Sequence, residues 1–252
     1  MTLNWVERLL VDNPVRSLVQ RRFEASLLFE LGGPVDGGRV LEIGCGRGAG
    51  VGILIERFGA AHVCAIDLDL RRLPRARRPG ASFVAGAAER LPFPNRSFDA
   101  VFDFGVLHHV SDWQAAVAEI ARVLKPSGRF YFEEVTAAAL NRWIYRALLK
   151  HPAENRFDEA RFLAELSACG LQYLENPRHL LAGDIFIGVS HMGHELTNWT
   201  RGSDSRSPNR SDAIIWAVTS LMFRLQLLNR VSRPRGNAYD LAALRVTLGD
   251  GS

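Results

Sequence analysis

The chain has 252 residues, 47% of them hydrophobic and 23% charged, with a mean hydropathy of −0.02. This composition excludes a disordered chain, which would be poorer in apolar residues and more highly charged. No apolar run approaches the ~18 residues that a membrane span needs. The formal net charge is +4, and most of that excess lies beyond residue 190. The nearly neutral body therefore indicates no nucleic-acid partner.

Cysteine usage and the N-terminus favour a cytoplasmic protein. The cysteines, Cys45, Cys64 and Cys169, are scattered and odd in number, which is typical of a reducing compartment. They form no CxxC pair and no Cys/His spacing of a metal site, so no metal is expected. The first ten residues carry Glu7 and Arg8 within their apolar stretch, unlike a secretory signal.

Helical and strand patterns alternate along most of the chain. A helix is expected to start at Pro14, after the N-cap residue Asn13, and to stop at Gly32. Apolar and β-branched runs predict seven strands, at 39–44, 62–67, 82–85, 98–103, 129–135, 171–174 and 184–189, with helices between them at 48–58, 111–124 and 158–168. This order favours an α/β fold with a doubly wound, mostly parallel, Rossmann-like sheet. The last two strands have no helix between them and are expected to form an antiparallel pair at one edge.

The same patterns divide the chain into four parts. Residues 1–34 are expected to form an N-terminal helical cover, and 35–190 the α/β domain. Residues 191–211 are rich in Gly, Ser, Asn and Arg and are interpreted as a linker. Residues 212–252 are expected to form a helical extension with an apolar stripe. That stripe would dock on the domain, pair with a second copy in a homodimer, or rest on a membrane surface.

The most informative segment is LEIGCGRG, residues 41–48, which follows a strand and opens a helix. Its alternate glycines let the backbone turn sharply and approach a ligand that a Cβ would block. Asp67 ends the next strand, where a carboxylate can accept both hydrogen bonds of a ribose diol. Gly44-x-Gly46-x-x-Ala49 also satisfies the dinucleotide fingerprint, so an NAD(P)-dependent oxidoreductase is one alternative. Glu42 favours a cofactor with a protonated amine and a positive sulfur, because a carboxylate stabilises both.

Further motifs follow this loop in order. The segments EIGCGRG, AID, AERLPFPNRSFDAV, VLHHV and LKPSGRF lie at 42–48, 65–67, 88–101, 106–110 and 124–130. Together they resemble the class I S-adenosylmethionine-dependent methyltransferases, in the small-molecule branch typified by the quinone-biosynthesis enzymes. The resemblance covers about residues 38–189. It implies a methyltransferase that binds S-adenosylmethionine within 35–190.

The resemblance also implies roles for the matching positions. The methionine end of the cofactor would be lined by one acid and three glycines: Glu42, Gly44, Gly46 and Gly48. Asp67 would hold the ribose hydroxyls, and Leu68 would pack against the adenine. Asp103 and Phe104 would lie near the methionine end and the methyl acceptor.

One part of the family pattern is missing. The family often carries an aspartate after the third strand that meets the adenine amino group, but this chain has Gly86-Ala87-Ala88-Glu89 there. The adenine would then be read by Ala87, Ala88 or Glu89.

Two pairs of polar residues are candidates for chemistry at the acceptor. His108 and His109 follow the fourth strand, and His108 is the candidate general base for an acceptor hydroxyl. The alternative is that these histidines pack against or hydrogen-bond the following helix. Glu133 and Glu134 end the fifth strand, and because side chains alternate along a strand only one of them can face the site.

The expected reaction is direct, in-line methyl transfer to oxygen or carbon of a small acceptor. Residues 136–156 carry Trp143 and Tyr145 in an amphipathic pattern that can form a helix at the ligand edge. This pattern favours a mostly apolar acceptor. A non-catalytic, cofactor-binding partner subunit is the alternative from another class, because the adenine aspartate is missing and the sequence offers no firm base.

Overall fold

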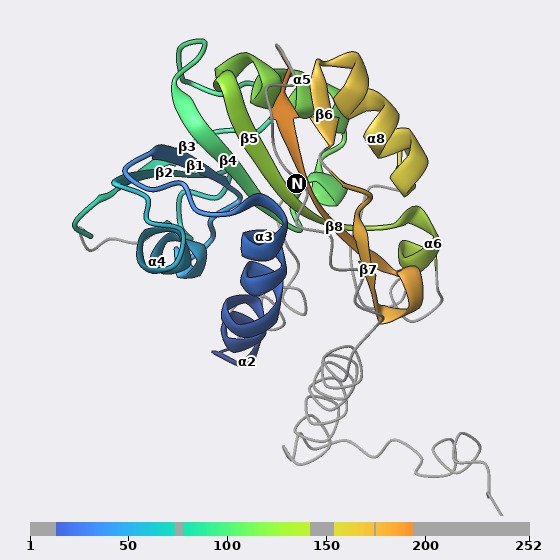
Figure 1. The fold of residues 1–252 in the computed structure, drawn as a ribbon, viewed down its shortest axis with the longest axis horizontal. Coiled ribbons are helices and arrows are strands. Elements are labelled where there is room, and N and C mark those ends of the chain that lie inside the picture. The colour runs from blue at the N-terminus through green and yellow to red at the C-terminus, as the bar shows by residue number, and fades with distance from the viewer. Residues whose placement is uncertain (1–13, 74–77, 142–153, 174, 194–252) are drawn as a thin grey trace, which may run out of the picture. The chain divides into compact units, whose positions relative to one another are not determined.

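The computed structural model describes residues 14–73, 78–141, 154–173 and 175–193 (Figure 1). All of these residues lie within the unit Met1–Ile215. Several expectations fall outside the described ranges: the cap at Asn13, most of the apolar helix expected in 136–156, the linker beyond residue 193, and the extension 212–252.

The described strands form one sheet in the order β3-β2-β1-β4-β5-β8-β6, with β7 paired to β8 (Figure 1). Strands β1 to β5 run parallel to one another, whereas β8 runs antiparallel to β5, β6 and β7. The bounds are β1 Arg39–Ile43, β2 His62–Asp67, β3 Ala81–Ala85, β4 Phe98–Phe104, β5 Leu124–Val135, β6 Leu171–Tyr173, β7 Arg178–Leu180 and β8 Ile185–Met192. The predicted fold class and the antiparallel edge pair are both confirmed.

Three details of the sheet differ from the prediction. Strand β5 begins at Leu124 rather than at Arg129. Strand β7 is not predicted, because Arg178 and His179 leave it a single apolar residue, Leu180, and therefore no alternating pattern. Strand β8 continues through Met192, so His191 and Met192 belong to the sheet rather than to a linker. His191 pairs with Arg129, and Met192 pairs with Leu171.

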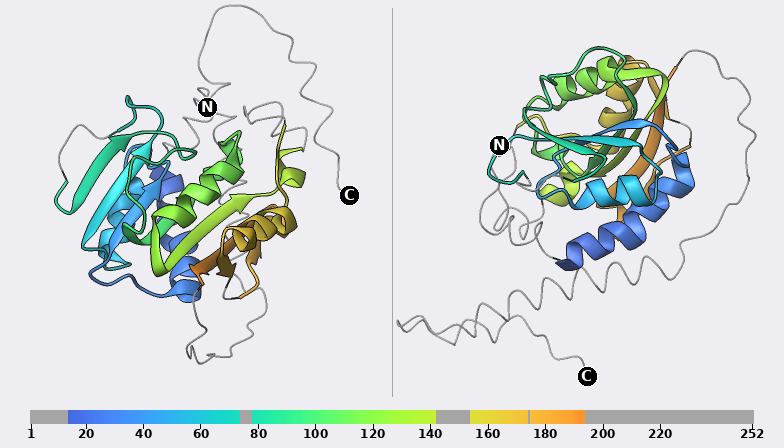
Figure 2. Two further views of the ribbon diagram at one scale, coloured as in Figure 1. Left: turned by 90° about the horizontal axis from the view of Figure 1, so that it is seen from above. Right: turned by 90° about the vertical axis from the view of Figure 1, so that its left-hand side faces the viewer.

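Helices cover both faces of the sheet (Figure 2). On one face lie α3 (Ala25–Gly32) and α4 (Ala49–Glu56), and on the other lie α5 (Trp113–Val123) and α8 (Glu159–Ala168). Before α3 the chain forms α2 (Pro14–Val19) and a π-helical segment, Gln20–Glu24. The short helices are α6 (Ala137–Leu140) and two 3₁₀ turns, Leu107–His109 and Leu181–Gly183. Within the described ranges no helix is long and apolar enough to cross a membrane.

Aspartate caps set the starts of the two helices on the second face. The Asp112 side chain accepts a hydrogen bond from the backbone N–H of Ala115 at 3.1 Å. The Asp158 side chain does the same for the N–H of Arg161 at 2.8 Å. These bonds satisfy N–H groups that have no partner inside the helix, and they confirm the predicted starts of both helices.

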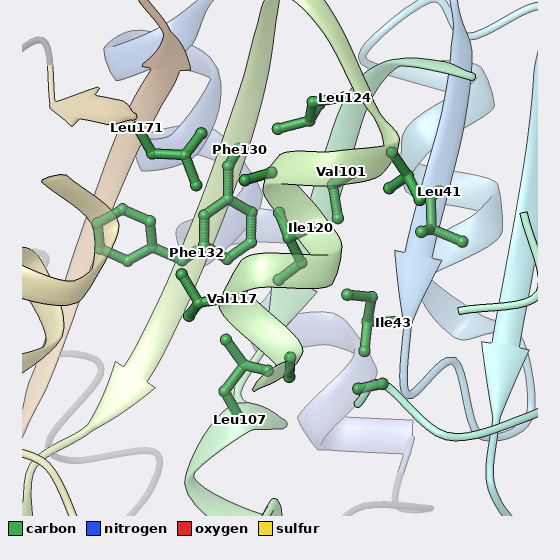
Figure 3. Packing of buried hydrophobic residues seen from close by; sticks show 14 of the residues in the cluster. Leu41, Ile43, Val101, Leu107, Val117, Ile120, Leu124, Phe130, Phe132 and Leu171 are labelled. Carbon is green, nitrogen blue, oxygen red and sulfur yellow. The ribbon is translucent and has the colours of Figure 1, made fainter. Parts of the chain in front are cut away.

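The core consists of one apolar layer on each face of the sheet. On the α5 face, Val117 and Ile120 belong to the same buried cluster as Val101 and Phe130 of the strands (Figure 3). On the α3 and α4 face, Phe58 meets Phe102 edge-on with ring centres 4.7 Å apart. Burial of these large side chains is the main driving force for the layered fold.

Tyr131 attaches the end of the N-terminal helical segment to the sheet. Its hydroxyl lies 2.9 Å from the carbonyl oxygens of both Gly32 and Gly33. A Cβ on Gly32 would overlap the tyrosine ring, so this approach requires glycine. Gly32 and Gly33 therefore do more than end the helix. They also dock it against Tyr131 of β5.

Candidate cofactor and acceptor site

The glycine loop between β1 and α4 adopts a backbone conformation that favours glycine at three positions. Gly44, Gly46 and Gly48 have φ values of +66°, +50° and +77°, a region that residues with a Cβ rarely adopt. Gly48 is the N-cap of α4, so the loop passes directly into the helix N-terminus. A Cβ on Gly44 would overlap Val106. The loop after β4, which contains Val106, therefore packs directly against the loop after β1.

Asp67 holds this loop in place from the end of β2. One carboxylate oxygen accepts a hydrogen bond from the Gly46 N–H at 2.8 Å, and the other accepts one from the Asp69 N–H at 2.8 Å. Asp67 itself is only 7% exposed, whereas the next residue, Leu68, is 53% exposed. A buried carboxylate beside an exposed apolar side chain suits a ribose diol next to a flat base.

Glu42 is buried beneath the loop. It is 3% exposed, and its carboxylate rests against Gly50 in the first turn of α4, where a Cβ would overlap it. Burial and, second, the charge of Asp67 raise the pKa of Glu42 to about 8, while Arg78 acts in the opposite direction. Among the described residues, Glu42 Oε2 has no hydrogen-bond partner. An unpartnered buried acceptor at the edge of a glycine cradle fits a ligand that brings an ammonium donor.

The segment after β3 contributes backbone more than side chains. The Gly86 N–H donates to the Asp67 carbonyl at 3.0 Å, which places this segment beside β2. Ala88 is 7% exposed and belongs to the apolar core, whereas Ala87 and Glu89 are partly exposed. Of the three positions expected to read an adenine, Ala87 and Glu89 are therefore the accessible ones.

Asp103 and Phe104 end β4 but differ in exposure. Asp103 is fully buried, and its carboxylate accepts a hydrogen bond from the Val106 N–H at 2.9 Å. Burial, together with the negative charge of Glu134, raises the pKa of Asp103 well above its usual range. Phe104 is half-buried and stacks on Phe102 at 6.0 Å. Asp103 thus stabilises the conformation of the loop after β4 through its bond to Val106.

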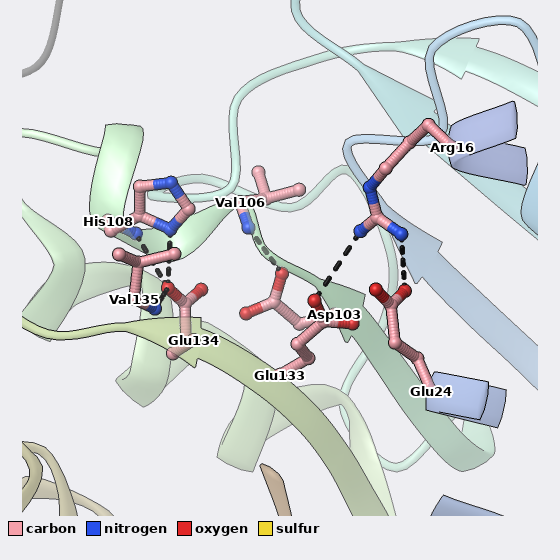
Figure 4. A network of polar contacts seen from close by, with 8 residues as sticks. All are labelled: Arg16, Glu24, Asp103, Val106, His108, Glu133, Glu134 and Val135. Carbon is pink, nitrogen blue, oxygen red and sulfur yellow. Dashed lines mark hydrogen bonds and ion pairs between the residues drawn. The ribbon is translucent and has the colours of Figure 1, made fainter. Parts of the chain in front are cut away.

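Glu134 orients His108, a pairing that the sequence does not reveal (Figure 4). The fully buried Glu134 accepts a hydrogen bond from the Leu107 N–H at 2.7 Å, and its other oxygen lies 2.6 Å from His108 Nδ1. Burial raises the pKa of Glu134 to about 7, although several hydrogen bonds oppose that shift. When His108 Nδ1 donates to this carboxylate, Nε2 carries the lone pair of the neutral ring.

A hollow lies beside His108 on the α5 face. It is small, and apolar and polar residues line it in nearly equal number: His108, Val110, Trp113, Val135, Leu140, Glu154, Asn155, Arg156 and Phe157. The apolar residues Trp113, Leu140 and Phe157 are almost fully buried, so the hollow exposes little apolar surface beside His108.

Glu133 faces the opposite side of the sheet from Glu134, as strand alternation requires (Figure 4). Arg16 of α2 lies 3.4 Å from Glu133 and also forms an ion pair with Glu24. Burial, followed by the charge of Glu24, raises the pKa of Glu133 well above its usual range, and Arg16 opposes this. No sequence signal points to Arg16, because its partner lies 117 positions away.

Part of the chain matches a known family. Residues 41–132 match the family model described as Methyltransferase domain. The Fatty-acid O-methyltransferase of Mycolicibacterium smegmatis is 38% identical over 104 residues, which are 40% of this chain and 38% of that relative. The Phthiotriol/phenolphthiotriol dimycocerosates methyltransferase of Mycobacterium tuberculosis is 33% identical over 128 residues, 49% of this chain and 46% of that relative. The matches thus span less than half the length of either curated relative.

The fold is shared with solved methyltransferase structures. A chain of the complex between the Haloferax volcanii Trm112 methyltransferase activator and a methyltransferase aligns with a TM-score of 0.62 at 17% identity, covering 77% of this chain and 100% of that chain. The family match favours the methyltransferase interpretation of the glycine loop over the dinucleotide one. The two curated relatives are named for fatty acids and phthiotriols, so they do not support the narrower resemblance to quinone-biosynthesis enzymes. Residues 41–132 therefore match the methyltransferase-domain family model, and the sheet that contains them shares its fold with a solved methyltransferase structure.

Proposed function

We propose that the protein transfers a methyl group from S-adenosylmethionine to a hydroxyl oxygen of an apolar, lipid-like acceptor. The observation that carries the proposal is the 2.6 Å contact between His108 Nδ1 and buried Glu134. His108 lies two residues after Val106, which packs against Gly44 of the glycine loop. The cofactor supplies a methyl group already activated on a sulfonium, so the protein contributes mainly binding, alignment and the removal of a proton.

The cofactor-binding residues in this proposal lie at the ends of β1 and β2. Glu42 and the glycines of the loop would hold the methionine end, Asp67 the ribose, and Leu68 the adenine. Support comes from the buried, unpartnered Glu42 oxygen and from the glycine backbone angles. The backbone near Ala87 and the side chain of Glu89 take the place of the family's adenine aspartate.

His108 is the general base in this proposal. Its Nε2 takes the hydroxyl proton while the oxygen forms its bond to the methyl carbon, and the bond between that carbon and sulfur breaks. Glu134 keeps the proton on Nδ1 and stabilises the imidazolium that results, as a carboxylate partner does in other histidine-based sites. The products are a methyl ether and S-adenosylhomocysteine.

The acceptor class follows from the names of the two curated relatives, which refer to fatty acids and phthiotriols. Trp113, Leu140 and Phe157 line the hollow beside His108 but are almost fully buried. A phenolic or quinol ring, as the resemblance to the quinone-biosynthesis branch implies, is the second acceptor to test. The four-part domain division, a homodimer, the cytoplasmic location and the lack of a nucleic-acid partner stay predictions.

Label transfer tests the proposal and separates hydroxyl from carboxyl acceptors. Purified protein with methyl-labelled S-adenosylmethionine is given long-chain alcohols, fatty acids and quinols. We expect His108→Gln to lower kcat for alcohols about 10²- to 10⁴-fold, because a hydroxyl must lose its proton. A fatty-acid carboxylate is already ionised at neutral pH and needs no base.

The matched control is His179→Gln, since His179 lies on β7 and pairs with Glu159. Methylation of fatty acids alone, unaffected by His108→Gln, would replace the hydroxyl acceptor with a carboxylate. Tight S-adenosylhomocysteine binding without any label transfer would favour a non-catalytic partner subunit. Calorimetric heat from NADH and none from S-adenosylhomocysteine would favour an oxidoreductase.

A further inference from the structure

Arg72 lies over the glycine loop, against Gly46. A Cβ on Gly46 would come within 2.6 Å of Arg72 Nη2, so the guanidinium occupies the space that this glycine leaves free. Arg72 Nη1 is also 3.8 Å from Asp67 Oδ2, and the two side chains are only 14% and 8% exposed. The cation is thus inserted into the site rather than extended into solvent.

The backbone after β2 directs Arg72 to this position. The Asp69 N–H donates to the Asp67 carboxylate at 2.8 Å, and the Arg72 N–H donates to the Asp69 carbonyl at 2.8 Å. This turn folds the chain back toward the loop. Arg71, one position earlier, is 74% exposed and forms its ion pair with Asp69. Two neighbouring arginines therefore differ sharply, and only Arg72 contacts the loop and Asp67.

The position of Arg72 conflicts with a ribose bound to Asp67. Each Asp67 oxygen already accepts one backbone N–H, from Gly46 and from Asp69, so a ribose diol must use the remaining lone pairs of the same carboxylate. The guanidinium lies against Oδ2 and against the open side of Gly46. A ribose and this arginine side chain compete for one carboxylate and one space.

We propose that Arg72 is a gate of the cofactor site, whose side chain must leave Asp67 before the ribose of S-adenosylmethionine can bind there. This inference rests on the proposed function. The closed position lowers the apparent affinity by the fraction of molecules in which Arg72 has moved away.

The test is calorimetric titration with S-adenosylhomocysteine, a probe with the same ribose. We expect Arg72→Ala and Arg72→Gln to tighten binding about 5- to 50-fold, by removing the closed population. The matched control Arg71→Ala stays within twofold of the wild type.

The Tm gives a second readout that a purely structural role would not reproduce. Without ligand, Arg72→Ala lowers the Tm, because Asp67 loses its cation. With saturating S-adenosylhomocysteine, the ligand-induced rise in Tm is larger for Arg72→Ala than for the wild type. A structural role alone would lower the Tm in both states and leave that rise unchanged.

Unchanged or weaker binding by Arg72→Ala would overturn the gate and make Arg72 a bystander or a ligand of the cofactor. Binding by the Arg72 variants but not by the wild type would support both the gate and the proposed function. Absence of binding by the wild type and by both variants would overturn the proposed function, and the gate with it.

Discussion

Two buried acids at this sheet edge differ in their hydrogen-bond partners. Glu42 and Asp67 are both acids at the ends of adjacent strands. Asp67 accepts two backbone hydrogen bonds, whereas Glu42 has a pKa raised to about 8, chiefly by burial. Two carboxyl groups thus offer a ligand an anchored ribose acceptor and a group that ionises when a cation arrives.

A pH-dependent loss of stability is expected from Glu42. Its carboxyl keeps a proton in the folded state up to about pH 8 but loses it near pH 4.5 when the chain unfolds. The folded state therefore binds more protons within this window, and its stability falls as pH rises, by at most about 1.4 kcal/mol per pH unit. Denaturant unfolding at pH 5.5 and 7.5 measures the fall.

The variant Glu42→Gln should show a smaller fall between the two pH values than the wild type. Glu30→Gln is the control, because Glu30 is an exposed acid that pairs with Arg178 on the surface. An identical pH dependence for Glu42→Gln and the wild type would contradict the assignment of this proton to Glu42.

At the scale of elements, the N-terminal helical segment is attached to the domain by ion pairs of different kinds. Arg16 of α2 contacts Glu133 of β5 and Glu24, and both of these carboxyl side chains are almost fully buried. Arg21 pairs with Glu56 of α4, and both side chains are about half exposed. A buried pair and an exposed pair thus join the same segment to two different elements.

These two arginines should differ in their effect on stability. Arg16→Ala leaves two buried acids without their cation, which is expected to lower the free energy of unfolding by about 3 kcal/mol. Arg21→Ala removes an exposed pair and is expected to lower it by less than about 1 kcal/mol. Urea unfolding at pH 7 measures both changes.

The loss for Arg16→Ala should shrink as the pH falls, because Glu133, whose pKa is raised chiefly by burial, then carries a proton and needs no cation. Equal losses for the two variants at pH 7 would mean that Arg16 does not act through its buried partners.

For the whole molecule, every candidate site residue lies upstream of the end of β8. The site draws on residues from Arg16 to Phe157, and β8 completes the sheet by pairing with β5, β6 and β7. The last described contact is the bond from the Gly193 N–H to the Gly170 carbonyl at 3.1 Å. The described sheet edge therefore ends at this point rather than at residue 190.

A chain truncated after Gly193 is expected to bind S-adenosylhomocysteine within twofold of the whole chain. A chain truncated after Ser190 should have a lower Tm, because it lacks His191 and Met192 and their pairing with Arg129 and Leu171. Calorimetry and thermal unfolding measure the two properties. Loss of binding by the chain that ends at Gly193 would show that residues beyond 193 take part in the site.

The sequence by itself determines the parts of this protein that depend on local order. Hydrophobic periodicity predicts every strand except β7. Strand β6 is equally short but alternates Leu171 and Tyr173, whereas β7 has only one apolar residue, Leu180. The glycine loop and Asp67 are also readable, because backbone angles at Gly44, Gly46 and Gly48 demand a residue type that the sequence displays.

Only the tertiary structure decides which side chains from distant segments meet. Glu134 meets His108 from 26 positions away, and Arg16 meets Glu133 from 117 positions away. These two contacts form because β5 lies beside β4 and because the N-terminal segment folds back over the sheet. Arg72 is close to Asp67 in sequence, yet it lies over Gly46 only because the turn after β2 directs it there. Which charged side chains pair across distant segments, and how deeply each is buried, depends on how the chain packs. The local sequence therefore does not predict these pairs or their pKa shifts.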